Sequence, residues 1–467
     1  MGVSWPSRIT TPPEAYKSPL TEAFWDLRSV DKQLQEVEEL AAKQRHAHPR
    51  PASASRKSIT YDFSRNSMLR SAYANPWGFI RISRVLEDLD ALAATIAMEH
   101  CATECSAHGV TFWPMLVTAS VDRIEMKQQP MLERDLVLSG HIVWTGRSSM
   151  QILMHCAVAQ DSTPAAEDAA ATAAAAAPSP WLEARFTFVA RSRDTGRSTP
   201  IPPLLIETPK EDEAFRHAQR AMDRKKLLRS GGGGATLAGA NGTAPVSSPE
   251  AEAAAAALLR EGRLLKAMPC LADPRSVLVG DTAQSSVIVC MPQERNTANR
   301  IFGGFLMGRA LELGFATAYT TVGAVPFTAV VDEVVFHQPV DVGDILKLDS
   351  CVLQTRAGGA LGRSPRASVE VLAHVLRPDK RTMHLSNRFD FTFKFPELAR
   401  RDDGEPQREL QRVLPSDVDE AQRVVQVMQR QALHREEQAD SGDSSSSTSA
   451  SSNGGVDGSG GSGSGGR

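Results

Sequence analysis

The sequence contains no run of about 18 consecutive apolar residues, so it predicts no membrane-spanning helix. Only six of its 467 residues are cysteines, and their spacing is irregular, which favours a reducing compartment over a disulfide framework. The formal net charge of −3 gives no electrostatic reason to expect nucleic acid or an acidic partner. The hydrophobic content of 41% is enough for two domains of ordinary size with extensions.

The most informative segment is 299–318, in which a glycine pair precedes an apolar helical pattern. Gly303 and Gly304 lack Cβ atoms, so a ligand can come close to the backbone there. The first amides of a helix have no partner within the helix, and with the positive end of the helix dipole they favour an oxyanion or a phosphate. Glu312 follows about two turns later, where burial raises a carboxyl pKa. The segment therefore predicts an anion-stabilising helix end near an acid.

A weaker copy of this segment lies at 75–87, and further motifs recur downstream in the same order. The matched residues are Gly78 with Gly304, Arg84 with Arg309, Glu87 with Glu312, Asp122 with Asp332, Arg147 with Arg366, and Arg185 with Arg388. Chance rarely produces several anchors in one order. We therefore predict that the chain contains two tandem copies of one domain.

The predicted organisation has five segments. They are a partly helical leader at 1–57, a first repeat at 58–205 with an alanine-rich insertion at 161–180, a helical and glycine-rich linker at 206–267, a second repeat at 268–397, and a C-terminal helix with a disordered Ser/Gly tail at 398–467. Each repeat contains a long helix, at 78–99 and at 303–320, and several strand-like runs. This pattern predicts an α+β architecture in which an antiparallel sheet wraps a central helix.

The runs 293–307 and 84–93, together with this architecture, closely resemble the mitochondrial-type acyl-CoA thioesterases with tandem hotdog domains, the acyl-CoA thioesterase 9 group. The resemblance covers both repeats and fails over the leader, the insertion, the linker and the tail. It implies a double hotdog fold and hydrolysis of acyl-CoA to a fatty acid and CoA. It also implies that no metal or other cofactor is needed, that the two repeats pair within the chain, and that the paired units can form a higher homo-oligomer.

The resemblance also implies roles for particular residues. Two oxyanion regions are expected, one at Asn299, Gly303 and Gly304, and one at Asn75 and Gly78. The candidate acids are Glu312 in the second helix and Glu87, Asp88 and Asp90 in the first, and Asp332 is a candidate for substrate contact. The family's usual helix acid lies one residue before Glu312, where this chain has Leu311. Since one residue turns a helix by about 100°, Glu312 and Asp90 both remain candidates for the catalytic acid.

Each candidate also has a structural interpretation. Glu312 can be a buried acid paired with Arg309, and the acids at 87–90 can form a solvated helix face. The glycine pair can serve close helix packing alone, and Asp332 can be a strand-edge residue.

Two other functions remain open at this stage. One is a non-catalytic protein that binds acyl-CoA, in which the displaced acid marks lost chemistry. The other is a dehydratase or hydratase, which is disfavoured because such enzymes need a helix histidine and none occurs at 75–90 or 303–320. The resemblance implies a mitochondrial location, but the first dozen residues show no amphipathic basic helix, so a cytoplasmic location also remains open.

Overall fold

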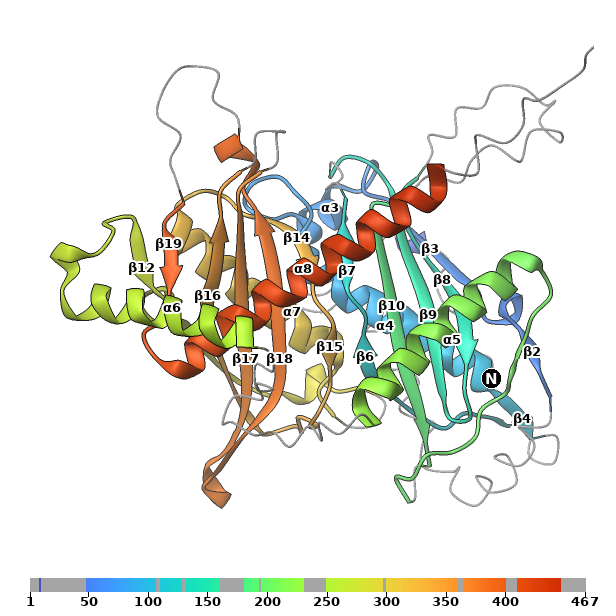
Figure 1. The fold of residues 1–467 in the computed structure, drawn as a ribbon. Coiled ribbons are helices and arrows are strands. Elements are labelled where there is room, and N and C mark those ends of the chain that lie inside the picture. Colours follow the sequence, from blue (N-terminus) through green and yellow to red (C-terminus); the bar gives the residue numbers. More distant parts are fainter. Residues whose placement is uncertain are drawn as a thin grey trace, which may run out of the picture.

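In the computed structural model, each half of the chain forms an antiparallel sheet that wraps one long helix, a double hotdog fold of the α+β class (Figure 1). The long helices are α4 (Ile82–Cys101) and α7 (Gly303–Val322). The structure describes residues 8–9, 48–105, 110–127, 132–159, 180–192, 195–230, 249–296, 300–358, 364–399 and 410–446.

The strands of the two halves follow similar orders. The first half contains β3 (Lys57–Tyr61), β6 (Met115–Val121), β7 (Ile124–Met126), β8 (Leu136–Thr145), β9 (Ser149–Val158) and β10 (Leu182–Arg191). The second half contains β13 (Gln284–Val289), β14 (Phe327–Val331), β15 (Val334–Val335), β16 (Ile345–Arg356), β17 (Arg366–Arg377) and β18 (Thr382–Lys394). The smaller strands are β1 (Arg8–Ile9), β2 (Arg50–Pro51), β4 (Thr103–Cys105), β5 (Val110–Phe112), β11 (Leu204–Leu205), β12 (Ser276–Leu278) and β19 (Arg412–Leu414).

The two sheets join edge to edge into one 13-stranded sheet. β7 of the first half pairs antiparallel with β14 of the second, with Ile124 opposite Val331. The reciprocal contact pairs β15 with β6, with Val334 opposite Val121. In these two contacts β6 corresponds to β14 and β7 corresponds to β15. The two halves are therefore related by an approximate twofold axis.

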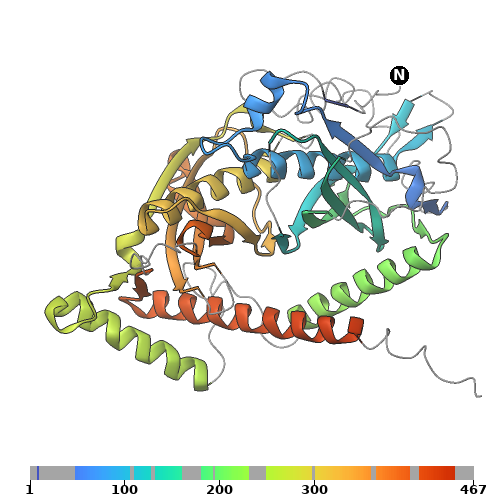
Figure 2. The ribbon, with the colours of Figure 1, turned by 90° about the horizontal axis from the view of Figure 1, so that it is seen from above.

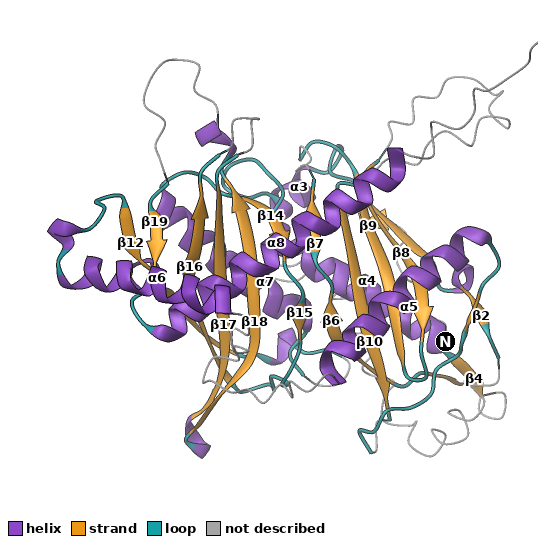
Figure 3. Ribbon diagram, viewed as in Figure 1, coloured by secondary structure: helices purple, strands orange, loops and turns teal. Residues whose placement is uncertain are grey.

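The helices form two layers, one on each face of this sheet (Figures 2 and 3). α4 and α7 lie side by side on the inner face and pack against each other. The outer face carries α5 (Pro209–Ser230) and α8 (Val418–Ser446), and α6 (Pro249–Ala267) packs on α8. The remaining short helix, α3 (Ser67–Tyr73), leads into α4.

The sequence of each long helix explains why it is central. In α4 apolar residues recur on successive turns, and Leu86, Leu89 and Ile96 are all fully buried. α7 is apolar on most sides and ends at Gly323, whose φ of 71° is the left-handed conformation that favours glycine. Both helices are therefore held between the sheet and each other.

The helix and strand predictions agree with the structure apart from the ends and several short elements. Residues 328–337 are one of the strand-like runs of the second repeat, but the structure divides them into β14 and β15. The sequence did not predict β3, α3 or the β4–β5 hairpin. The leader helix, residues 161–179 of the insertion, the Gly-rich run 231–248 and the tail beyond 446 lie outside the described residues. No described helix is long and apolar enough to cross a membrane.

Candidate active site

The N-terminus of α7 faces Asp90, a carboxylate in the middle of α4. Asp90 is fully buried. The backbone N–H of Gly304 donates to its Oδ2 atom at 2.7 Å, and the Thr118 hydroxyl of β6 donates to Oδ1 at 3.0 Å. Both halves of the chain therefore build one arrangement, which we call the Asp90 site and define as Asp90, Thr118, Gly303 and Gly304.

The environment of Asp90 suits proton transfer near neutral pH. Burial raises the pKa of its carboxyl group to about 7, although the hydrogen bonds from Gly304 and Thr118 lower it. Burial acts in this direction because a charged carboxylate loses its solvation in an apolar interior. A general base works best when its pKa lies near the operating pH.

The glycine pair allows α7 to approach α4 closely. A Cβ atom on Gly304 would lie 2.9 Å from the Cα of Glu87, and one on Gly303 would lie 3.1 Å from Oδ2 of Asp90. A side chain at Gly304 would therefore push the helices apart, and one at Gly303 would crowd the Asp90 carboxylate. The pair serves the packing of the two helices and also brings the Gly304 amide to the acid.

The structure relates the two halves in a register that differs by one helical turn from the sequence comparison. Both long helices have 20 residues, and their first residues are Ile82 and Gly303. Aligning these starts places Asp90 opposite Leu311. The resemblance puts the usual family acid at Leu311, and in this register Asp90 is the residue of the first half equivalent to Leu311.

The loop before each helix supports this register. The N–H of Asn75 donates to the carbonyl of Phe79 at 2.8 Å, and the N–H of Asn296 donates to that of Arg300 at 2.6 Å. Each loop also contains an isolated β-bridge in the same register, Ala74 with Ile80 in the first half and Arg295 with Ile301 in the second. Asn296 is thus the counterpart of Asn75, and sequence reasoning missed it. The common spacing of the two asparagines from the helix starts is the signal that could have identified it. The predicted Asn299 lies outside the described residues.

Glu312 lies in an ion-pair cluster, apart from the Asp90 site. Its carboxylate accepts hydrogen bonds from Arg81 at 2.9 Å, from the Ser83 hydroxyl at 2.8 Å and from Arg309 at 3.0 Å. Its side chain is 32% exposed. The predicted pair with Arg309 is therefore present, with two further donors, but the expectation of a buried acid is wrong because Glu312 is only partly buried.

Glu87 and Asp88 are buried, so the interpretation of 87–90 as a solvated helix face is wrong. Burial raises the pKa of Glu87 to about 8, and Arg84, whose guanidinium lies 3.5 Å from the carboxylate, lowers it. Asp88 accepts hydrogen bonds from the hydroxyls of Tyr61 at 2.7 Å and Tyr73 at 2.5 Å. Asp88 thus ties α4 to β3 and α3.

The structure places Asn75 and Gly78 in the turn before α4. The side-chain oxygen of Asn75 accepts the N–H groups of Trp77 at 3.0 Å and Phe79 at 2.9 Å. Gly78 has a φ of +79°, which strains any residue with a side chain. These two residues shape the loop of the first half, whereas the Asp90 site lies at the start of the helix of the second half.

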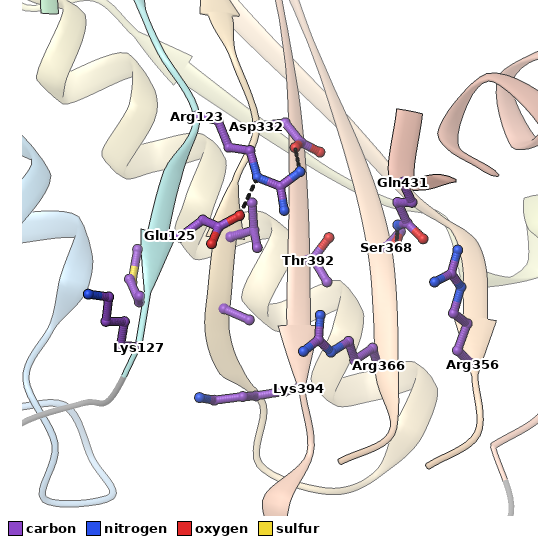
Figure 4. Close-up of a pocket in the computed structure, with 13 residues that line it drawn as sticks. Arg123, Glu125, Lys127, Asp332, Arg356, Arg366, Ser368, Thr392, Lys394 and Gln431 are labelled. Atoms are coloured by element: carbon purple, nitrogen blue, oxygen red, sulfur yellow. Dashed lines mark hydrogen bonds and ion pairs between the residues drawn. The ribbon is translucent and has the colours of Figure 1, made fainter. Parts of the chain in front are cut away.

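Asp332 lines a cleft of about 360 Å³ on the outer face of the sheet, opposite α7 (Figure 4). It pairs with Arg123 at 3.6 Å, and Arg123 also contacts Glu125 at 2.9 Å. The other cations that line the cleft are Lys127, Arg356, Arg366 and Lys394. The sheet separates this cleft from the Asp90 site, so the structure does not bring Asp332 together with the predicted acids.

The described residues contain no group of three or more His, Cys, Asp or Glu side chains placed to hold a metal ion. The Asp90 site itself offers one carboxylate, one hydroxyl and the amides of a helix end. This set can move one proton and stabilise one developing negative charge.

No family model matches the chain, but it is similar in sequence to several known proteins. The chain is 38% identical over 423 residues to acyl-coenzyme A thioesterase 2, chloroplastic, from Humulus lupulus, covering 90% of each. It is 31% identical over 356 residues to acyl-coenzyme A thioesterase 9, mitochondrial, from Bos taurus, covering 76% of this chain and 74% of the relative. Among solved structures, an acyl-ACP thioesterase from Bacteroides thetaiotaomicron matches with a TM-score of 0.38 and 9% identity, covering 74% of this chain and 100% of that one. The chain belongs to the acyl-coenzyme A thioesterase family.

Proposed function

We propose that the chain hydrolyses acyl-CoA thioesters at the Asp90 site, with Asp90 as the general base. The observation that carries this proposal is a fully buried carboxylate held by the first turn of α7 and by Thr118. CoA enters as part of the substrate, and the reaction uses no cofactor. The proposal favours Asp90 over Glu312, because Glu312 is ion-paired with Arg81 and Arg309, whereas the amide and the hydroxyl that donate to Asp90 are uncharged.

In the proposed reaction, Asp90 accepts a proton from a water molecule, and the resulting hydroxide attacks the thioester carbonyl carbon. The carbonyl oxygen becomes an oxyanion, which the Gly303 amide stabilises at the positive end of the α7 dipole. The tetrahedral intermediate then expels the CoA thiolate, which takes the proton back from Asp90. We assign Asn296 or Asn299, both of which precede α7 by a few residues in the sequence, to polarise the carbonyl.

A thiol-release assay tests the function directly. The purified chain is incubated with short-, medium- and long-chain acyl-CoA, and free thiol is followed with a chromogenic disulfide. We expect release from at least one chain length. If none releases thiol and calorimetry still detects acyl-CoA binding, the chain is the non-catalytic binding protein instead.

The pH dependence of kcat/KM should report Asp90. Because the base must be ionised, the rate should rise with pH and level off above about 7. Thr118→Val removes a hydrogen bond that lowers this pKa, so the inflection should move to higher pH.

The matched control for Thr118→Val is Thr95→Val. Thr95 is also buried and lies on α4, but its hydroxyl donates to the Ala91 carbonyl. The control should leave the inflection in place. An unmoved inflection in the Thr118 variant would contradict the role of Asp90.

We also carry the mitochondrial assignment to this chain as a proposal. It rests on relatives whose names place them in mitochondria, such as those from Bos taurus and Homo sapiens. Assembly into a higher homo-oligomer stays a prediction. Imaging of the full-length chain fused to a fluorescent protein tests the location.

A further inference from the structure

The approximate twofold axis creates a second site, related to the Asp90 site but chemically different. The register that places Ile82 opposite Gly303 also places Ser83 opposite Gly304 and Leu311 opposite Asp90. The sheet junction, in which Val121 and Val331 are equivalent, places Thr328 opposite Thr118. Together Ile82, Ser83, Leu311 and Thr328 line one cavity of about 440 Å³. We call this cavity the counterpart cleft.

The counterpart cleft has lost the acid. Leu311 is 3% exposed and stands where Asp90 stands in the other half. The one carboxylate among its lining residues is Glu312, which Arg81, Ser83 and Arg309 hold in an ion-pair cluster. No described group in the cleft is therefore free to activate water.

The lining of the cleft is largely apolar. Aromatic rings form much of its wall, with Trp77 and Phe315 centroids 5.1 Å apart and Phe79 and Phe327 centroids 4.8 Å apart. Trp77 is 37% exposed, so the wall reaches the surface. Such a wall favours an alkyl chain, since removal of apolar surface from water is the main driving force for binding there.

Charged residues lie between the two sites. Glu87 of α4, which pairs with Arg84, lies against Gly308 of α7, between Gly304 of the Asp90 site and Glu312 of the cleft. An alkyl chain that crossed this layer would desolvate the charges. The counterpart cleft is thus separate from the Asp90 site.

We propose that the counterpart cleft binds a fatty acyl chain without hydrolysing it, as free fatty acid or as the tail of an acyl-CoA. The choice of ligand rests on the proposed function, but the cleft itself does not. Under this proposal one chain holds two acyl groups, one at the site with the acid and one at the site without it.

Equilibrium dialysis of the full chain carrying Asp90→Asn tests the proposal. This substitution should slow turnover by about two to four orders of magnitude, and the bound label is counted as palmitoyl-CoA only after intact thioester is separated from released palmitate. We expect two palmitoyl-CoA bound per chain. Val325→Trp, added to the Asp90→Asn chain, places a large ring in the cleft. This double variant should bind one palmitoyl-CoA per chain.

The matched control is Val287→Trp, since Val287 is 63% exposed on β13 and does not line the cleft. The chain with Val287→Trp should still bind two palmitoyl-CoA. Trp77→Ala is a second variant of the cleft. Because Trp77 is partly exposed, this substitution should disturb folding less than one in the core. It should weaken binding at the second site about five- to tenfold through loss of a ring contact. Thermal melts of each variant check folding.

Competition experiments show which part of palmitoyl-CoA the counterpart cleft binds. Excess palmitate should displace one palmitoyl-CoA, whereas CoA alone should not displace it from the counterpart cleft. The proposal would be overturned if one palmitoyl-CoA binds per chain and neither Val325→Trp nor Trp77→Ala changes that number. It would also be overturned if CoA, but not palmitate, displaces palmitoyl-CoA from the counterpart cleft. A chain that binds two acyl groups while the wild type releases no thiol would refute the proposed function and leave this inference intact.

Discussion

Asp90→Asn should lower thiol release by about two to four orders of magnitude, the range that a positioned general base contributes. The amide keeps nearly the same shape, and its oxygen can still accept the Gly304 N–H. Its NH₂ group can donate to the Thr118 hydroxyl, which can rotate to accept. The measurement is kcat and KM determined separately for the best acyl-CoA, because a loss of substrate binding alone would raise KM without lowering kcat.

The same variant should not be less stable than the wild type. The folded-state pKa of Asp90, about 7, lies above the usual value of 3.8 for the unfolded chain. The unfolded carboxyl therefore ionises first as pH rises, so this group lowers the stability of the fold between about pH 4 and 7 and by a constant amount above that. Asp90→Asn removes this cost, and chemical denaturation at pH 8 should show equal or higher stability. If the variant is inactive and also unfolded, the stability prediction is wrong and the loss of rate reflects unfolding instead of the loss of a general base.

Glu312→Gln is the matched comparison, since Glu312 was the other predicted acid. We expect thiol release to stay within a few fold of the wild type. The ion pairs with Arg81 and Arg309 are partly exposed, so their loss should cost no more than about 1 kcal/mol of stability. A loss of rate as large as that of Asp90→Asn would contradict the assignment to Asp90.

The sequence was sufficient to predict the fold, because periodicity and repeated motifs are properties of the chain itself. The two long helices and most of the long strands lie where the apolar patterns place them. The short elements β3 and α3 were missed because their burial depends on contacts such as Tyr61 and Tyr73 with Asp88, which join distant segments.

The site was predicted less well, because the choice among acids depends on the register between the halves. The match of Arg84 with Arg309 suggested an equivalence of Glu87 and Glu312. The structure instead aligns the starts of the helices, one turn away, and makes Asp90 equivalent to Leu311. Sequence alone could not show that the amide reaching Asp90 belongs to Gly304, 214 residues away.

The attachment of α8 to the outer face depends on a buried ion cluster, and breaking it should produce the largest loss of stability. Glu370 of β17 is 1% exposed and forms ion pairs with Arg423 of α8 and, at 2.8 Å, with Arg388 of β18. Glu370→Leu leaves the buried guanidinium group of Arg423 and the partly buried one of Arg388 with fewer acidic partners. Removing one partner of a buried pair costs about 3 to 5 kcal/mol, which chemical denaturation can measure.

The double variant Glu370→Leu/Arg423→Leu separates charge from packing. Because it removes the charge that the single variant leaves on α8, it should recover most of the lost stability. The surface control is Glu261→Leu, whose partner Arg412 is half exposed, and it should cost no more than about 1 kcal/mol. A Glu370 variant as mild as the surface control would show that α8 is held by its apolar contacts instead. Since α8 lies on the face opposite α4 and α7, the folded fraction of the Glu370 variant should still release thiol at the wild-type rate (Figure 2).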